Sequence, residues 1–304
     1  MKQALLKMHL AVFLWGFTGI LGRAIELDAF PLVWYRVLLS SLFFLILLLA
    51  RKEKLTVSAK ELLKFALIGS IIAVHWCCFY GAIKYANASI ALVCLATAGI
   101  FTTILEPFFL KSKFNYREML IGFVALVGMY FIYRFEIEYA IGIGMGILAA
   151  VLSSLFTVMN KKIVDGYSPR LVAFYEIFFG FLFLSILIPI YTNYFPSVSF
   201  SPSAMDWLWL VVLSLFCTVW GQALALEALK KLSSFTTVLM VNLEPVYGII
   251  LAIIFYKENE DLGWGFVMGM LLIGGSVAIH SIHMLPKDNK LRKRFNLKRI
   301  FIRK

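Results

Sequence analysis

The sequence predicts an all-α integral membrane protein of ten transmembrane helices, arranged as two inverted repeats of five helices each. Composition is the first observation: the 304 residues are 62% hydrophobic and 15% charged, with a mean hydropathy of +0.88, unlike an ordinary soluble domain. The second is the recurrence of apolar runs of roughly 18–24 residues, long enough to cross ~30 Å of hydrocarbon as helices. The third is that the second half of the chain repeats the landmarks of the first.

Ten apolar runs carry this prediction. In chain order they lie near residues 8–25, 31–50, 64–83, 89–110, 119–133, 140–160, 171–191, 206–229, 234–256 and 262–282. Each should be helical, because a backbone in lipid must satisfy its own hydrogen bonds, and none shows the alternation of a transmembrane strand. The first run follows Lys2 and Lys7 but lacks a small-x-small cleavage site, so we interpret it as a retained helix rather than a signal peptide.

Paired landmarks place the two halves in register. They are two lysine pairs 27 positions apart (Lys84/Lys111 and Lys230/Lys257), two glycine pairs six apart (Gly122/Gly128 and Gly269/Gly275), and the segments 31–36 and 169–176. Five spans is an odd number, so the second copy must enter the membrane from the opposite side, as in many transporters. We therefore assign residues 1–135 to the first repeat, 136–284 to the second and 285–304 to a basic tail.

Positive charge sets the predicted orientation. With the N-terminus inside, the inner segments hold 24 of the 29 lysines and arginines and the outer ends only four, a strong positive-inside bias. Both termini are therefore expected in the cytoplasm and the protein in the cell membrane. The basic tail is expected to contact anionic lipids of the inner leaflet. Topology, rather than nucleic-acid binding, accounts for the net charge of +12.

The sequence lacks the motifs that are typical of several other functional classes. The four cysteines, Cys77, Cys78, Cys94 and Cys217, fall inside spans without the spacing of a metal site or a disulfide framework. Carboxylates and histidines are scattered over separate spans, and no dinucleotide-binding or P-loop motif occurs. We expect no catalytic residues, no metal and no cofactor.

Short segments in both halves point to a known family. They are Trp15-Gly16, Arg36, residues 82–85 (Ala-Ile-Lys-Tyr), Ala88-Ser89, residues 228–230 (Ala-Leu-Lys), Pro245 and Lys257-Glu258. With the ten-span layout, they resemble the EamA-type branch of the drug/metabolite transporter superfamily over nearly the whole chain. The resemblance implies a secondary transporter that exports amino acids, other small metabolites or drugs. Gly99 stands where that family usually has a proline, and Lys111-Ser112 where it has Gly-Glu, which leaves a bend in the fourth span open.

Glu244 is the main candidate for substrate binding. An ionisable group near the membrane midplane is costly and usually functional. The neighbouring Pro245 removes a backbone donor, and with Asn242 this creates a local polar patch. We interpret Glu244 as a carboxylate that binds a cation, an amine or a proton in a central cavity. A buried structural carboxylic acid is the alternative.

Other spans offer side chains to the same cavity. They are His75, Trp76 and Tyr80 in the third span, Trp220 and Gln222 in the eighth, and Trp15 and Thr18 in the first. His75 is a candidate proton relay, and the aromatic rings could stack on a hydrophobic or cationic substrate. Helix packing, or a hydrogen bond to a neighbouring helix, is the structural alternative for each.

Arg36 and Glu176 occupy matching places in the two repeats. We predict that they border the two mouths of the cavity as gate residues. Arg36 could also bind a substrate carboxylate in bidentate fashion, or pair structurally with Glu26 or Asp28.

These features predict a secondary transporter, in the exporting direction, of small organic metabolites such as amino acids. It would work by alternating access at a midplane site between the repeats, as a monomer or a homodimer. An intramembrane lipid-modifying enzyme is one alternative, but it needs catalytic groups clustered at one interface. A non-transporting scaffold or receptor is another, but it does not need polar groups aligned toward one cavity.

Overall fold

The computed structural model describes residues 1–304 except 87, 133–138, 245, 249–250, 252–263 and 285–304. The described residues form helices and connecting turns, without a β-strand among them, which confirms the all-α prediction. Pro245, Lys257 and the basic tail, on which parts of the sequence interpretation rest, lie outside the described residues.

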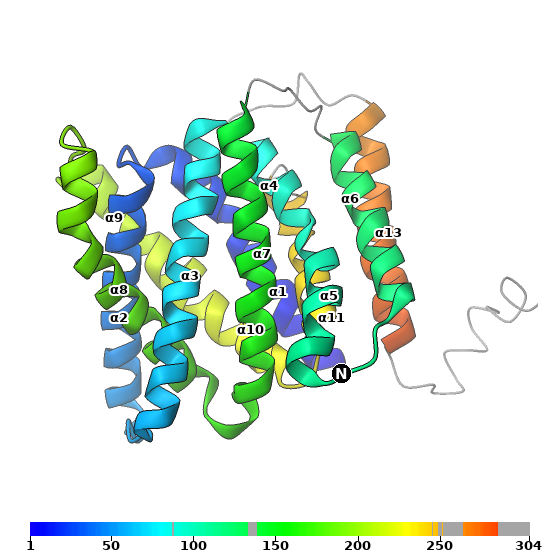
Figure 1. The fold of residues 1–304 in the computed structure, drawn as a ribbon, viewed down its shortest axis with the longest axis horizontal. Helices are drawn as coiled ribbons and strands as arrows, with labels where there is room; N and C mark the ends of the chain where they lie inside the picture. The colour runs from blue at the N-terminus through cyan, green and yellow to red at the C-terminus, as the bar shows by residue number, and fades with distance from the viewer. Residues whose placement is uncertain (87, 133–138, 245, 249–250, 252–263, 285–304) are drawn as a thin grey trace, which may run out of the picture.

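The chain folds into a bundle of helices that mostly run along one direction (Figure 1). The first half contains α1 (Lys2–Ala24), α2 (Ala29–Ala50), α3 (Ala59–Tyr85), α4 (Ala88–Ala96), α5 (Ala98–Leu110) and α6 (Tyr116–Ile132). The second half contains α7 (Ala140–Ile163), the 3₁₀ turn η2 (Val164–Gly166), α8 (Pro169–Tyr194), α9 (Ala204–Val212), the π-helix η3 (Leu213–Trp220), α10 (Gly221–Leu229), α11 (Ser234–Val241) and α13 (Trp264–Met284).

Among the described residues, six helical spans are long and apolar enough to cross a membrane. They are Lys2–Gly22, Ala29–Ala50, Ala59–Tyr85, Ala140–Gly166, Pro169–Tyr194 and Ala204–Leu229. Two shorter apolar helices cover Cys94–Leu110 and Leu271–His280. The predicted fourth, fifth, ninth and tenth spans thus correspond to shorter helices within the described residues.

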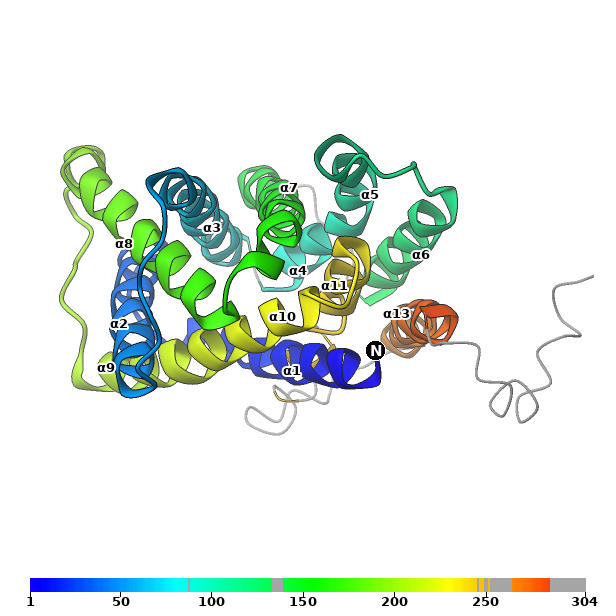
Figure 2. The ribbon, with the colours of Figure 1, turned by 90° about the horizontal axis from the view of Figure 1, so that it is seen from below.

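The two halves of the chain interleave. α1 packs against η3 and α10, α3 packs against α7 and α8, α2 packs against α8, and α6 packs against α13. Figures 1 and 2 both show α6 and α13 side by side at one edge of the bundle, with α2, α8 and α9 at the other. The centre of the bundle is therefore formed by helices from both halves.

Serine residues begin four of the helices. Ser58, Ser168, Ser203 and Ser233 each accept, through the side-chain hydroxyl, the N–H of the residue three positions on. Such caps satisfy one of the amide groups left free at a helix start, and each contributes about 1 kcal/mol. The local sequence therefore fixes where α3, α8, α9 and α11 begin.

The fourth predicted span is broken rather than continuous. The break lies at Thr97, whose hydroxyl donates to the Cys94 carbonyl at 2.6 Å and whose N–H contacts the same oxygen at 3.1 Å. A threonine hydroxyl that bonds back to the backbone competes with the helical ladder and bends the helix. Ser154 on α7 donates to the Ala98 carbonyl just beyond the break, at 2.7 Å. The span therefore bends without the proline usual in the resembling family.

The ninth predicted span is interrupted at the matching position. The register that pairs Lys84 with Lys230 also pairs Thr97 with Leu243. There the N–H groups of Asn242 and Leu243 bond three residues back instead of four, which is the tighter 3₁₀ pattern. Glu244 follows this break directly, so the interruption helps to position it.

A close contact between α3 and α8 depends on Gly69. A Cβ at this position would lie 2.1 Å from the backbone oxygen of Glu176, far inside any real contact distance. We expect Gly69→Ala to force the two helices apart and to lower stability by about 1–3 kcal/mol, the usual effect of overpacking. Thermal unfolding in detergent, followed by tryptophan fluorescence, measures this change.

Gly144→Ala is the matched control, because a Cβ at Gly144 on α7 meets nothing within 4 Å. It should unfold at or slightly above the wild-type temperature, since alanine favours a helix over glycine. Equal melting temperatures for Gly69→Ala and Gly144→Ala would contradict the close contact.

Candidate functional site

One cavity lies in the centre of the bundle, where helices from both halves meet. Its wall is built from α1, α2, α3, α4, α7, α10 and α11, and it contains about 840 Å³ of space outside the protein atoms, including the part open to solvent. Ile72, Phe79, Leu95 and Phe156 give it apolar sides. A cavity with apolar walls and a few polar groups is the usual form of a small-molecule site.

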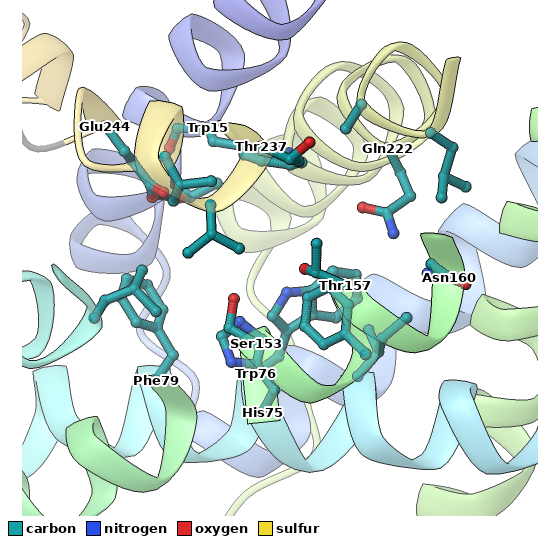
Figure 3. Close-up of a pocket in the computed structure, with 18 of the residues that line it drawn as sticks. Trp15, His75, Trp76, Phe79, Ser153, Thr157, Asn160, Gln222, Thr237 and Glu244 are labelled. Atoms are coloured by element: carbon teal, nitrogen blue, oxygen red, sulfur yellow. Dashed lines mark hydrogen bonds between the residues drawn. The ribbon is translucent and has the colours of Figure 1, made fainter. Parts of the chain in front are cut away.

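Two polar stripes run along the cavity. Ser153, Thr157 and Asn160 lie three or four residues apart on α7, and so share one face of that helix. Across the cavity, Thr237 and Glu244 are contributed by α11 and the turn that follows it. Figure 3 shows Glu244 and Asn160 toward opposite ends of the space, so the cavity offers polar contacts along its whole length.

Arg36 lies in the wall of the cavity, although its exposed fraction is only 3%. Its Nε donates to Thr218 Oγ1 at 2.9 Å and its Nη1 to the Tyr80 hydroxyl at 3.2 Å. The guanidinium carbon lies 4.0 Å from the centre of the Trp76 ring, a cation–π contact. These neutral partners orient the arginine but leave its positive charge uncompensated.

The π-helix η3 supplies one of these contacts and braces the helices around it. The Thr218 hydroxyl accepts from Arg36 Nε and donates to the Leu213 carbonyl five residues back, at 3.2 Å. Ser214 Oγ donates to the Arg36 carbonyl at 3.3 Å, and Trp15 Nε1 donates to the Cys217 carbonyl at 2.9 Å. π-helical turns often occur at functional sites, and this one joins α1 and α2 to the second half.

Glu244 lies in the same cavity and is also held by a neutral group. Thr18 Oγ1, on α1, is 3.1 Å from Glu244 Oε1 and also donates to the Trp15 carbonyl at 2.6 Å. Glu244 Oε2 has no hydrogen-bond partner in the described parts of the chain, and neither has Arg36 Nη2. Arg36 and Glu244 are not an ion pair with each other within 4.0 Å. The cavity thus contains a basic and an acidic side chain that do not pair with each other.

His75 lies near Trp76 on the α3 side of the cavity (Figure 3). Its Nδ1 is 2.7 Å from the Ala149 carbonyl. A carbonyl only accepts, so Nδ1 carries the proton and the imidazole Nε2 is the acceptor. The hydrogen bond to α7 is the structural alternative considered for this residue, and it orients the ring.

The predicted binding residues divide between the cavity wall and its surroundings. Trp15, Thr18, His75, Trp76, Gln222 and Glu244 line the cavity. Trp220, Tyr80 and Asn242 do not. Trp220 is 52% exposed, because residues two apart on a helix do not face the same side and Gln222 takes the inward position. Tyr80 is fully buried beneath Arg36 and supports it.

Neither predicted gate residue lies at an open mouth. Arg36 is in the cavity wall, and Glu176 on α8 is completely buried behind it. Glu176 Oε2 accepts from Asn160 Nδ2 at 3.3 Å, so it reaches the cavity only through Asn160. The roles of Arg36 and Glu176 as gate residues that border the two mouths of the cavity therefore stay a prediction.

Comparison with known proteins identifies the family. The sequence profile of the EamA-like transporter family matches twice, over residues 2–134 and 140–282. The chain belongs to the EamA-like transporter family. One relative is an uncharacterized transporter of Clostridium kluyveri, which is 27% identical over 79% of this chain and 78% of that protein. Another is the uncharacterized transporter YxxF of Bacillus subtilis, 24% identical over 95% and 92%.

A solved crystal structure has the same fold. It superposes with a TM-score of 0.75 at 16% identity, covering 93% of this chain and 98% of the other. Family membership and the apolar helices make this EamA-family chain a multi-pass membrane protein and a membrane transporter. No group of three or more metal-binding side chains occurs among the residues that the structure places.

Sequence reasoning missed part of the EamA-family cavity. Ser153, Thr157, Asn160 and Thr237 line the cavity but are not among the predicted binding residues. The signal was present in the spacing, because three polar residues recur at helical intervals in the otherwise apolar α7. A polar stripe on a transmembrane helix indicates a cavity-facing side better than any single polar residue does.

Proposed function

We propose that this protein is a secondary transporter that exports small zwitterionic metabolites, such as amino acids, by alternating access. The observation that carries the proposal is a basic and an acidic side chain, Arg36 and Glu244, that line one cavity without pairing with each other. Arg36 Nη2 and Glu244 Oε2 are both without a hydrogen-bond partner within the described chain. Buried charges are costly unless paired, and a substrate with one carboxylate and one ammonium group would compensate both at once.

The proposed architecture is ten membrane spans in two inverted repeats, residues 1–135 and 136–284. The family profile, which matches once in each half, supports it, as do the corresponding breaks at Thr97 and Leu243. The positive-inside bias supports cytoplasmic termini in a cell membrane. In that orientation the cavity extends from the middle of the bundle toward the cytoplasmic end, where α7 ends and α11 begins. That position suits loading of substrate from the cytoplasm.

Polar contacts outside the cavity also tie the two halves of the chain together. Lys7 on α1 forms an ion pair with Glu227 on α10. In the α2–α3 loop, Glu53 accepts from Arg170 at 2.8 Å and from Ser168 at 2.7 Å. Partial burial raises the pKa of Glu53, but these hydrogen bonds outweigh it and hold the pKa below its usual value. Glu53 therefore stays charged at neutral pH and ties the loop to α8.

A panel of three related compounds tests the proposed substrate class. The purified protein is reconstituted in liposomes, and exchange is measured for labelled leucine, its decarboxylated amine 3-methylbutylamine and its deaminated acid 4-methylpentanoate. These compounds share one apolar side chain that suits the walls formed by Phe79 and Phe156. We expect saturable exchange of leucine and at least about tenfold slower exchange of each single-charge analogue, since each leaves one buried charge unpaired.

Equal exchange of all three compounds would overturn recognition of both charges. Absence of saturable exchange across leucine and the other common amino acids would overturn the proposed substrate class. Glu53→Gln serves as the control variant, because Glu53 lies outside the cavity and its removal should leave selectivity among the three compounds unchanged.

A further inference from the structure

A second buried carboxyl lies beside the cavity, apart from the charged pair that would bind substrate. Glu176 on α8 is 0% exposed, and its Oε1 has no hydrogen-bond partner in the described chain. Its neighbour Asn160 on α7 is 1% exposed and has an equally unpartnered Oδ1. The two side chains meet through a single hydrogen bond, from Asn160 Nδ2 to Glu176 Oε2 at 3.3 Å. Two neighbouring buried oxygens, Glu176 Oε1 and Asn160 Oδ1, thus accept no hydrogen bond within the described chain.

Within the part of the chain that the structure describes, no charged side chain compensates Glu176. Burial and the hydrogen bond from Asn160 are the influences on the ionisation of its carboxyl. Ionisable side chains on the packed helices α2, α3, α7 and α10 have partners elsewhere: Arg36 with Thr218 and Tyr80, Tyr35 with Phe200, Lys64 with Glu61, His75 with Ala149, Lys84 with Ile25, Lys161 with Leu229, and Glu227 with Lys7. Lys60 and Lys162 are exposed at the surface. An ionised Glu176 would therefore be an unpaired charge in a nonpolar interior, which is strongly unfavourable.

One bound proton would supply the hydrogen-bond donor that Glu176 Oε1 and Asn160 Oδ1 both lack. A proton on Glu176 Oε1 becomes a donor, and Asn160 Oδ1 is the acceptor on the neighbouring amide. The carboxylic acid and the amide would then share two hydrogen bonds in a ring, since Nδ2 already contacts Oε2. A buried polar pair is stable only when every member is satisfied. With one proton bound, Glu176 and Asn160 can satisfy each other's hydrogen bonds. Without it, Glu176 Oε1 and Asn160 Oδ1 both lack a donor.

Asn160 gives this proton a route to the cavity. Asn160 lines the cavity with Thr157, whereas Glu176 lies behind it. A carboxyl without contact to any cavity-lining residue would have only a structural role. Here the amide is shared between the carboxyl and the space that substrate would occupy, so water in the cavity can exchange a proton with the pair when the cavity opens to either side.

We propose that Glu176 and Asn160 form a proton-binding site that couples export to a proton gradient. The proposal rests on the transport function proposed above. Glu176 takes up one proton when the cavity faces outward and releases it when the cavity faces inward, so the carboxyl returns to its starting state in each cycle. Glu244, which pairs with the substrate ammonium, is left free of this task. The two carboxyls divide substrate binding and proton binding between them.

Glu176→Gln separates coupling from substrate binding. Glutamine keeps the shape of the protonated acid and its hydrogen bonds but cannot release a proton. In liposomes with the membrane potential clamped, labelled leucine exchange at equal pH on both sides should remain in this variant. Accumulation driven by a pH gradient should fall at least tenfold, and proton movement reported by an internal pH dye should be lost. Glu53→Gln, which removes a carboxyl outside the membrane, should keep all three signals.

The wild-type protein and a second variant keep the proposal open to refutation. Wild-type flux that ignores the pH gradient overturns it, as does gradient-driven accumulation by Glu176→Gln with an unchanged pH profile. Should Glu176→Gln not fold, Asn160→Ala retains the carboxyl and removes half of the ring. It should shift the pH at which gradient-driven flux is half-maximal, and an unshifted profile counts against the site. If wild-type protein exchanges no substrate at all, the proposed function fails first, before coupling is in question.

Discussion

Glu244→Gln is expected to weaken leucine binding by roughly 30-fold to several thousand-fold, the range that corresponds to 2–5 kcal/mol. Glutamine matches glutamate in size and can still accept from Thr18, so packing of the turn after α11 is retained. What disappears is the negative charge opposite the substrate ammonium. The remaining positive charge of Arg36 then makes the cavity selective for anions, and 4-methylpentanoate should lose little affinity.

The measurement is the concentration of each compound that gives half-maximal exchange in liposomes. Glu227→Gln is a matched control, since it makes the same substitution at a carboxyl that pairs with Lys7 outside the cavity. Its leucine affinity should stay within about threefold of wild type. Equal losses for leucine and 4-methylpentanoate in Glu244→Gln would contradict pairing between Glu244 and an ammonium group.

The class of fold could be predicted because it depends on the average properties of long segments. Apolar runs, repeated landmarks and loop charge all point to a helical membrane protein, and one or two atypical residues do not change that outcome. The serine caps of α3 and α8 are likewise local, so helix starts follow from a few adjacent residues. Such features need no knowledge of which helix packs against which.

Local backbone departures were harder to foresee. η3 is eight residues of π-helix, and a π-helical turn changes the rotation of every residue after it relative to an α-helix. A prediction that treats the whole eighth span as an α-helix therefore assigns faces wrongly on one side of η3. The break at Thr97 arises from a hydroxyl that bonds to its own helix, a choice that depends on packing as well as on sequence.

The candidate site could be predicted in its types of residue but not in its partners. Glu244 and Arg36 were conspicuous because charges are rare inside membrane spans. Their relationship required the fold, since it depends on α1, α2, α3 and the turn after α11 meeting at one cavity. The pairing of Glu176 with Asn160 was equally hidden, because it depends on how α7 and α8 meet in the folded chain. Contacts between segments, rather than residue types, decide what each charge can bind.

Arg36→Lys is the second substitution with a large expected effect. Lysine keeps the positive charge but lacks the planar guanidinium, so it loses the geometry that contacts Thr218, Tyr80 and Trp76 together. A bidentate contact to a substrate carboxylate is lost as well. We expect leucine affinity to fall by about 10- to 100-fold, while 3-methylbutylamine, which has no carboxylate, should change by less than about threefold.

Arg36→Gln should go further, because it removes the positive charge and leaves Glu244 as the dominant charge in the cavity. The amine should then bind more tightly than leucine, reversing the wild-type order. Arg170→Lys provides the control: Arg170 pairs with Glu53 at the surface, where an ion pair contributes about 0–1 kcal/mol, so selectivity should not change. If Arg36→Gln left leucine preferred over the amine, Arg36 would be a structural brace held by Thr218 and Tyr80 rather than the carboxylate contact. The order of affinities for the two compounds therefore separates a substrate contact from a packing role.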